Sequence, residues 1–179
     1  SIHTIFRADG STDSLERALT RICQYSEDAV IDGYAIILLT DRGIDSSHAA
    51  IPSLLATSAV HHHLANKGLR AKVGIIVEAG DVWESHHFAT LIGFGASGVN
   101  PYMAFETIKG MKDKNMLNVD YPYEKLEKNY IKAVNGELLK IFSKMGISTL
   151  QSYQGAQIFE ALGISNEVVN KYFSGTVSR

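Results

Sequence analysis

Several kinds of residue are scarce in this sequence of 179 residues, and each scarcity excludes a class of protein. The single cysteine, Cys23, has no partner for an internal disulfide, and one thiolate cannot build a cysteine-ligated zinc or iron–sulfur site within this chain. The longest apolar run, residues 34–39, is far shorter than the roughly 20 residues that a membrane-spanning helix needs. Residues 1–6 show no signal-peptide pattern, so we expect a cytoplasmic protein without a membrane partner.

Charge of one sign is also lacking. Lys and Arg number 17, Asp and Glu number 19, and the formal net charge is −2. Because no basic excess is present to bind a phosphate backbone, we expect no nucleic-acid partner. The 45% hydrophobic and 20% charged residues are typical of a soluble globular protein, and the length predicts one domain over 1–179.

Hydrophobic periodicity predicts an alternation of strands and helices. Two buried strands are expected at 34–40 and 72–78, because both are short runs that are apolar on both faces, and a third, very short strand is expected at 97–100. Helical spacing is found over 12–32, 52–67, 83–94, 102–111 and 124–145. Ser11 or Thr12 is expected to cap the first helix, and Ser148 and Ser165 are expected to cap two final helices.

This order predicts an α/β fold with a short parallel βαβα sheet. Three or four strands fit an incomplete sheet or part of a β/α barrel. The α/β part covers 1–111, and the polar segment 112–123 is expected to be a surface loop. The helix-rich part over 123–179 must then pack against the α/β part or against something outside this chain.

Polar side chains follow the predicted strands at their carboxyl ends. Asp41 and Arg42 follow the first strand, Glu78 ends the second and Asn100 ends the third. In parallel α/β sheets these ends lie on one side, where ligands bind, so a polar rim with one fixed cation is expected. Arg42 could form a bidentate pair with a carboxylate. Such a pair could be catalytic, but a salt bridge that holds two loops is the favoured interpretation.

The seven histidines invite a metal hypothesis. Residues 61–63 are consecutive on a predicted helix, where neighbours point in different directions and cannot converge on one ion. His86 and His87 are adjacent, and Glu84 precedes His87 by three positions. That Glu-x-x-His spacing occurs in di-iron bundles, which need a second copy that this sequence lacks. Structural roles are therefore favoured over a metal site.

The glycines at 93–98 match the pattern G-x-G-x-x-G. A dinucleotide-binding fingerprint follows a strand and opens a helix, whereas these glycines follow a predicted helix and precede a strand. A helix cap and a tight turn explain them better. No G-x-S-x-G motif and no Cys–His pattern is present, so the residues alone identify no catalytic set.

Several sequence blocks, taken in order, resemble the central domain of the large subunit of glutamate synthase. Among glutamate synthases they resemble the bacterial nicotinamide-dependent type more closely than the ferredoxin-dependent type. They cover most of 30–179, and the first helix fits too. The blocks are 41–43 (DRG), 52–56 (PSLLA), 60–64 (VHHHL), 77–78 (VE), 86–89 (HHFA), 91–96 (LIGFGA), 100–102 (NPY), 143–153 (SKMGISTLQSY) and 155–161 (GAQIFEA).

The resemblance implies the later part of a central domain that joins two catalytic domains and helps to form the channel carrying ammonia between them. The implied partners are an amidotransferase domain, a flavin-barrel domain with FMN and an iron–sulfur cluster, and a small subunit. No cofactor is expected in this chain, and the isolated chain should be inactive. The expected rim or channel residues are Thr40, Asp41, Arg42, Glu78, His86, His87 and Asn100.

One alternative stays open from the residues. A small stand-alone enzyme could bind a metal or a flavin at the strand-end loops together with His86 or His87. It predicts a bound ion or cofactor at those residues, whereas a scaffold domain predicts exposed apolar surface where other domains dock.

Overall fold

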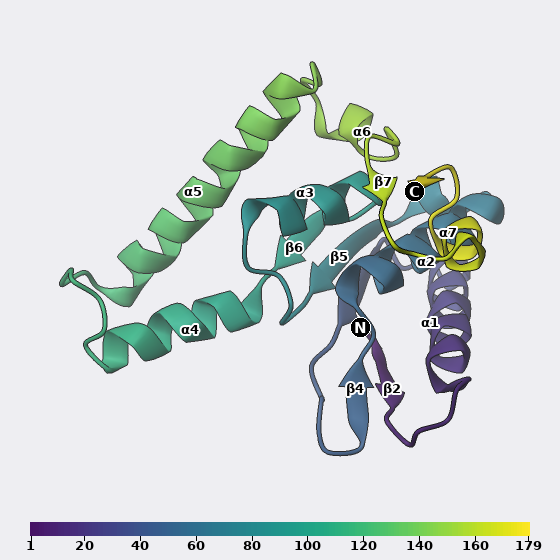
Figure 1. Ribbon diagram of the computed structural model, residues 1–179, viewed down its shortest axis with the longest axis horizontal. Coiled ribbons are helices and arrows are strands. Elements are labelled where there is room, and N and C mark those ends of the chain that lie inside the picture. Colours follow the sequence, from purple (N-terminus) through teal and green to yellow (C-terminus); the bar gives the residue numbers. More distant parts are fainter.

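A four-stranded parallel sheet forms the centre of the computed structural model, which describes residues 1–179 (Figure 1). Its strand order is β1-β3-β5-β6, with β1 at Ile2–His3, β3 at Ile36–Thr40, β5 at Gly74–Glu78 and β6 at Gly98–Asn100. Helices α1 (Ser14–Ile31), α2 (Ser53–Asn66) and α3 (Ser85–Gly93) connect these strands in turn. The predicted α/β class with a short parallel sheet is confirmed.

The two faces of this sheet differ in burial. Ile37, Leu39, Ile75 and Val77 point to one face and are buried in a core with side chains of α1, α2 and α3. On the opposite face Ile36 is 66% exposed, and the neighbouring apolar side chains are only half-buried. Helices therefore cover one face of the sheet, as in a β/α barrel, while the face that would point into a barrel stays open.

An arm of two helices follows β6. In Figure 1, α4 (Tyr102–Asp113) runs away from the sheet and α5 (Tyr123–Lys144) returns toward α3. The arm is tied to the rest of the chain by Tyr130 of α5, whose hydroxyl donates to the Trp83 carbonyl at 3.0 Å. Within the arm, the Tyr130 ring packs edge-on against Phe105 of α4. The chain continues through α6 (Leu150–Tyr153), β7 (Glu160–Ala161), α7 (Asn166–Tyr172) and β8 (Val177–Ser178).

Several short elements were not predicted. Besides β1, they are β2 (Ile5–Arg7) paired antiparallel with β4 (His48–Ala50), the parallel pair β7 and β8, and the 3-10 helix η1 (Arg70–Lys72). Strands of two or three residues are too short to show an alternating pattern, so only the tertiary pairing defines them.

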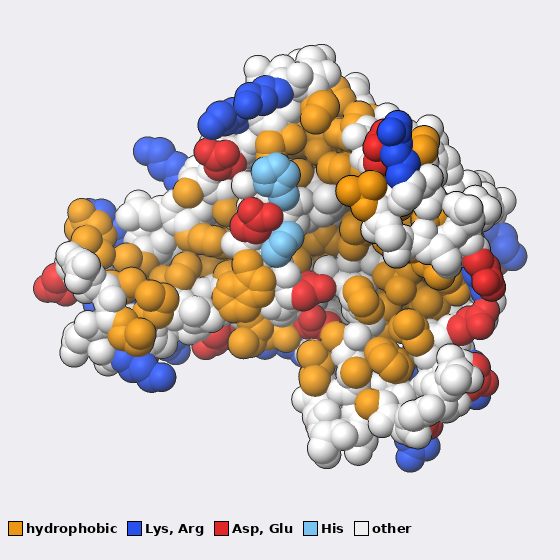
Figure 2. Space-filling model, viewed as in Figure 1, with side chains coloured by type: hydrophobic (Ala, Val, Ile, Leu, Met, Phe, Trp, Pro, Cys, Tyr) orange, Lys and Arg blue, Asp and Glu red, His pale blue; other side chains and the backbone are white.

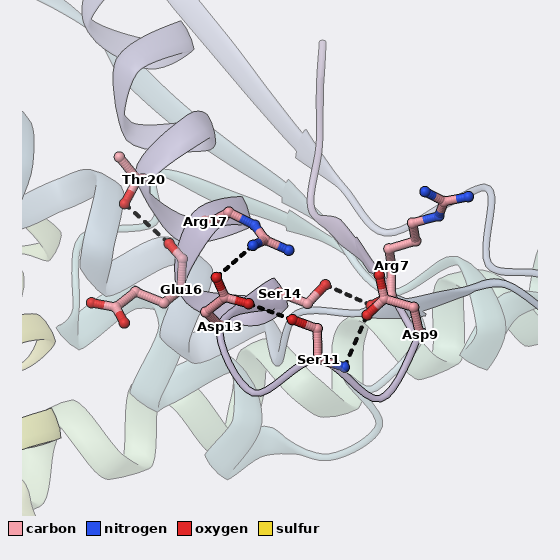
Figure 3. Close-up of polar contacts among 8 residues, drawn as sticks. All are labelled: Arg7, Asp9, Ser11, Asp13, Ser14, Glu16, Arg17 and Thr20. Atoms are coloured by element: carbon pink, nitrogen blue, oxygen red, sulfur yellow. Dashed lines mark hydrogen bonds and ion pairs between the residues drawn. The ribbon is translucent and has the colours of Figure 1, made fainter.

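The start of α1 differs from the prediction (Figure 3). The helix begins at Ser14, and neither Ser11 nor Thr12 caps it. Ser14 instead donates its hydroxyl to the Arg7 carbonyl at 2.6 Å, while Asp13 accepts hydrogen bonds from Ser11 and from Arg17. The helix start is thus tied to the end of β2.

The caps of the last two helices give a mixed result. Ser165 caps α7 as predicted, since its hydroxyl accepts from the Val168 amide. The prediction for Ser148 is wrong by one position, because the next residue, Thr149, has the extended backbone of a cap and accepts from the Ser152 amide. None of the helices is long and apolar enough to cross a membrane.

Candidate functional site

One row of side chains crosses the sheet at its carboxyl end. The register places His3 beside Thr40, Thr40 beside Glu78, and Glu78 beside Asn100. In parallel strands, residues in register point to the same face. These four residues, the carboxyl-end row, therefore lie together on the open face, opposite to the helix-covered core.

Glu78 is the centre of this row. Its Oε1 accepts from the Thr40 hydroxyl at 2.8 Å and pairs with Arg42 Nε at 3.0 Å, and its Oε2 accepts from the Asn100 side-chain amide at 2.9 Å. Burial by itself would raise the pKa of the Glu78 carboxyl, but the hydrogen bonds from Thr40 and Arg42 outweigh it and lower the pKa. Glu78 is thus held ionised, with both oxygens engaged by protein donors.

Arg42 holds the loop after β3 against this row. Only its Nε pairs with Glu78, so the contact is not bidentate. The guanidinium carbon lies 3.9 Å from the centre of the Tyr102 ring, within the range of a cation–π contact. The Arg42 carbonyl lies 3.0 Å from His3 Nδ1, and its amide donates to the Thr40 hydroxyl at 3.2 Å. These contacts make Arg42 a tie between β1, β3, β5 and the start of α4.

Asp41 occupies a separate, more buried position. It is 4% exposed, its Oδ2 accepts from the Gly80 amide at 2.8 Å, and its Oδ1 has no hydrogen-bond partner. Burial, together with the nearby Asp41 carboxylate, raises the pKa of Tyr102 to about 12. A Cβ placed on Gly80 would come within 3.1 Å of the Tyr102 hydroxyl, so this glycine permits the close approach of the ring.

His86 and His87 do not join the row. Both lie in the first turn of α3 and are exposed, and their acidic neighbour is Glu84, at 3.9 Å from His86 and 3.7 Å from His87. His87 Nδ1 also accepts from the Trp83 amide at 3.1 Å. No hydrogen bond or ion pair connects either histidine with Thr40, Glu78 or Asn100. The structure thus brings together five of the seven expected rim residues, in two adjoining clusters, and leaves these two apart.

No set of side chains supports the metal form of the alternative hypothesis. No group of three or more His, Cys, Asp or Glu side chains in the chain converges closely enough to hold a metal ion. Glu84, His86 and His87 supply neighbouring polar atoms, but the separations between these atoms are those of surface ion pairs.

Two of the three histidines at 61–63 have polar partners, whereas the buried Nε2 of His62 has no hydrogen-bond partner. His61 Nδ1 accepts from Arg70 Nε at 2.9 Å, and the same guanidinium donates to the Gly95 carbonyl at 2.6 Å. Burial, followed by the charge of Arg70, lowers the pKa of His61 to about 4. His63 Nε2 lies 2.7 Å from a carboxylate oxygen of Glu27. These side chains join α2 to its neighbours.

The G-x-G-x-x-G segment is part of the same packing. Gly93 ends α3, Gly95 has a φ of +110°, and Gly98 begins β6. The glycines therefore follow a helix and lead into a strand, which is the reverse of the dinucleotide-binding arrangement. A side chain at Gly95 would meet His61 Nδ1 at 2.1 Å, so packing explains the glycine there.

Two residues of the site were missed from the sequence. Tyr102 comes two positions after Asn100, so extending the strand-end rule past Pro101 would have found it. His3 carried no comparable signal, because β1 has only two residues and was not predicted.

Comparison with known proteins now decides the family. The profile described as the glutamate synthase central domain matches residues 1–165. The chain belongs to the glutamate synthase central domain family. The family predicted by resemblance is confirmed.

The relatives of this central domain include three types of glutamate synthase. It is 47% identical to "Glutamate synthase [NADH]" of Schizosaccharomyces pombe over 98% of the chain and 8% of the relative. It is 48% identical to "Glutamate synthase [NADPH] large chain" of Bacillus subtilis over 94% of the chain and 11% of the relative. It is 45% identical to "Ferredoxin-dependent glutamate synthase" of Pyropia yezoensis over 99% of the chain and 12% of the relative. The chain thus spans about a tenth of the length of each relative. Its sequence identity is nearly the same to the NADH, NADPH and ferredoxin types, so identity does not indicate which electron donor the parent enzyme uses.

The fold of the central domain is similar to part of a flavoprotein barrel. A flavocytochrome b2 double mutant with sulfite bound aligns with a TM-score of 0.56 and 16% identity, over 87% of this chain and 39% of that protein. This likeness concerns the fold alone, and it agrees with the predicted incomplete β/α barrel.

Proposed function

We propose that residues 1–179 serve as a non-catalytic part of a glutamate synthase, joining its amidotransferase and flavin domains and lining part of the path of ammonia between them. The observation that carries this proposal is the closed carboxyl-end row. In β/α enzymes this end of the sheet presents free catalytic groups to a ligand. Here the row's one carboxylate, Glu78, has both oxygens engaged by Thr40, Arg42 and Asn100.

The proposed division of the parent enzyme is supported by the relatives, of which this chain spans about a tenth. The chemistry of the parent enzyme, with its FMN and iron–sulfur cluster, would lie in polypeptide outside residues 1–179, and a small subunit would be a further partner. Within the chain, 1–111 and 123–179 would act as two parts of one domain. A cytoplasmic location is part of the same proposal.

The row suits the wall of an ammonia path. Ammonia is small and uncharged, and a free carboxylate would favour its protonated form, ammonium, and hold it. Glu78 already accepts three contacts from protein donors, so it offers a fixed polar surface without an open anionic site. The open face on which the row lies is available to whatever encloses the other side of the path.

The test is made in the parent synthase with Thr40→Val and Asn100→Leu. Valine keeps the shape of threonine but cannot donate to Glu78, and leucine replaces an amide of the row with an apolar side chain. We expect glutamate formed per glutamine hydrolysed to fall severalfold, while glutamine hydrolysis and flavin reduction stay near their normal rates.

The exposed substitution Glu84→Gln is the control and should leave this ratio unchanged. If Thr40→Val and Asn100→Leu also leave the ratio unchanged, the channel role is wrong. If either abolishes glutamine hydrolysis or flavin reduction in an enzyme that still folds, the row serves catalysis, and the non-catalytic assignment is wrong.

A further inference from the structure

A small pocket lies between α2, the end of α3 and the C-terminal part of the chain. Its volume is about 180 Å³, and its walls include two stretches of that part, 155–159 and 174–176. These segments are far apart in the sequence, but the structure packs α7 against α2 and α6 against α3 (Figure 1). The pocket is separate from the carboxyl-end row, because none of the four residues of the row lines it.

Several polar groups around this pocket have no partner within the protein. The side chains of Gln157, Ser174 and Thr176 line it and make no hydrogen bond to the rest of the chain, and the buried Nε2 of His62 has no partner either. In the carboxyl-end row, by contrast, both oxygens of Glu78 are engaged. Convergent polar groups that the protein itself does not use are the usual mark of a ligand site.

The two histidines of the pocket are neutral at pH 7. Burial, followed by the charge of Arg70, lowers the pKa of His61 to about 4, and burial also lowers the pKa of His62. Because His61 Nδ1 accepts from Arg70 Nε at 2.9 Å, the neutral His61 ring carries its proton on Nε2. The remaining lining residues are Ser, Thr, Gln, Gly, Phe and Ile, so the wall has no ionised side chain.

Gln157 is held in an unusual backbone conformation. Its φ is +54°, in the left-handed region that side chains rarely adopt. Its amide nitrogen lies so near the backbone of Gly175 that a Cβ there would come within 2.2 Å of it. The amide is therefore placed beside the hydroxyl-bearing residues 174 and 176. Residues kept in this region of backbone space cluster at ligand sites.

Aromatic rings form the apolar part of the wall. Phe94 and Phe159 both line the pocket, with ring centres 5.9 Å apart and planes inclined by 26°. A flat ligand can lie against such a surface. A cavity of about 150 Å³ is large enough to hold benzene, so this pocket has room for a molecule with a single ring.

We propose that this pocket binds a small uncharged molecule that combines one flat ring with a primary amide. The ring would pack on Phe94 and Phe159. The amide has two donors and one acceptor, and it would bond to the unused groups of Gln157, Ser174 and Thr176. This site does not depend on the ammonia role of the carboxyl-end row.

A charged ligand does not suit the pocket. A carboxylate or an ammonium group would be taken out of water with no ionised side chain at the wall to balance it. The guanidinium of Arg70, which contacts His61, already donates to His61 and to the carbonyls of Val73 and Gly95. A free amino acid, with its two charges, is excluded for the same reason.

The experiment titrates the chain of residues 1–179 at pH 7 with three probes of nearly the same shape. Benzamide is neutral, benzoate is an anion and benzamidine is a cation. Amide chemical shifts in NMR spectra report where each probe binds. We expect saturable benzamide shifts at Gly95 and within 155–159 and 174–176, and binding of the two charged probes that is about tenfold weaker or more.

Two variants provide matched controls. Gln157→Met keeps the length of the side chain and removes its amide, so the benzamide affinity should fall about fivefold or more. Gln151→Met makes the same change at an exposed position of α6 outside the pocket and should leave the affinity unchanged. The amide spectrum of each variant shows that it is folded.

Four outcomes would overturn the proposal. They are no saturable benzamide shift, shifts centred outside the pocket, equal binding of the three probes, and an unchanged benzamide affinity in folded Gln157→Met. Equal binding of the three probes would mean a contact with the aromatic rings alone.

Discussion

At the scale of single residues, His61, Arg70 and Gly95 form one packed group between α2, η1 and the turn after α3. His61, which the sequence offers as one of three adjacent histidines, accepts from Arg70 and lies against the backbone of Gly95. Gly95 in turn has a positive φ that side chains rarely adopt. The conformation of each of these three residues therefore depends on its contacts with the other two.

Gly95→Ala tests this packing. The added Cβ would lie 2.1 Å from His61 Nδ1 at a φ of +110°, so both the contact and the backbone oppose it. We expect the free energy of unfolding to fall by about 2–4 kcal/mol in urea denaturation.

Gly110→Ala is the matched control. Gly110 lies within α4, where an added Cβ meets nothing within 4 Å. Alanine should raise the free energy of unfolding by about 0.5–1 kcal/mol, because it favours the helix. Similar effects of the two substitutions would contradict the proposed fit of His61 against Gly95.

At the scale of elements, the arm of α4 and α5 is attached along a narrow stripe. Leu138 is 9% exposed on the side facing α3, while the next residue, Leu139, is 69% exposed. Successive helical residues point about 100° apart, so one leucine packs and the other faces solvent. The arm is thus held by few side chains, among them Tyr130 and Leu138.

Leu138→Ala is expected to lower the free energy of unfolding by about 2–4 kcal/mol, since it removes buried volume between α5 and α3. Leu139→Ala should change it by less than about 0.5 kcal/mol. Urea denaturation of both variants measures the difference. Equal effects would mean that α5 does not pack on α3 through Leu138.

At the scale of the whole molecule, the fold is a barrel segment with an open side. Helices cover one face of the sheet, and the arm projects away from the core (Figure 1). Figure 2 shows hydrophobic side chains in broad areas of one surface, including the arm. Such surface is expected of a domain that packs against others in a longer chain.

The stability of the whole domain should depend on pH through His61. Its pKa in the folded chain is about 4, below the ordinary value of 6.5, so the unfolded chain binds a proton that the folded chain excludes between these values. The stabilisation is complete above pH 6.5 and is lost as the pH falls toward 4. Glu78, with its lowered pKa, loses its contribution only at lower pH, below the ordinary carboxyl value of 4.5.

We therefore expect the free energy of unfolding to fall by about 2 kcal/mol more between pH 7 and pH 5 in the natural chain than in His61→Gln. Urea denaturation at the two pH values measures this difference. His86→Gln, at an exposed position of α3, should keep the full pH dependence of the natural chain. If His61→Gln leaves the pH dependence of the free energy of unfolding unchanged, titratable groups other than His61 cause that dependence.

The sequence by itself determined the elements whose signals are local. The apolar runs 34–40 and 72–78 contain β3 and β5, because a run of Ile, Leu and Val bounded by polar residues is a strand signal that needs no partner. Helical spacing located α1 to α5 within a few residues of their ends. The ordered blocks shared with glutamate synthases determined the family, and the strand-end rule placed Glu78 and Asn100 on one edge.

Only the tertiary structure decided which of these residues meet. Strand β1 exists because Ile2 and His3 pair with β3, and through it His3 joins the carboxyl-end row. The row itself depends on the register of four strands, which no local pattern encodes. His86 and His87 looked equivalent to the other rim residues in sequence, but the direction of the first turn of α3 places them at the surface beside Glu84. Contacts between distant segments follow from packing, and packing is set by the whole chain at once.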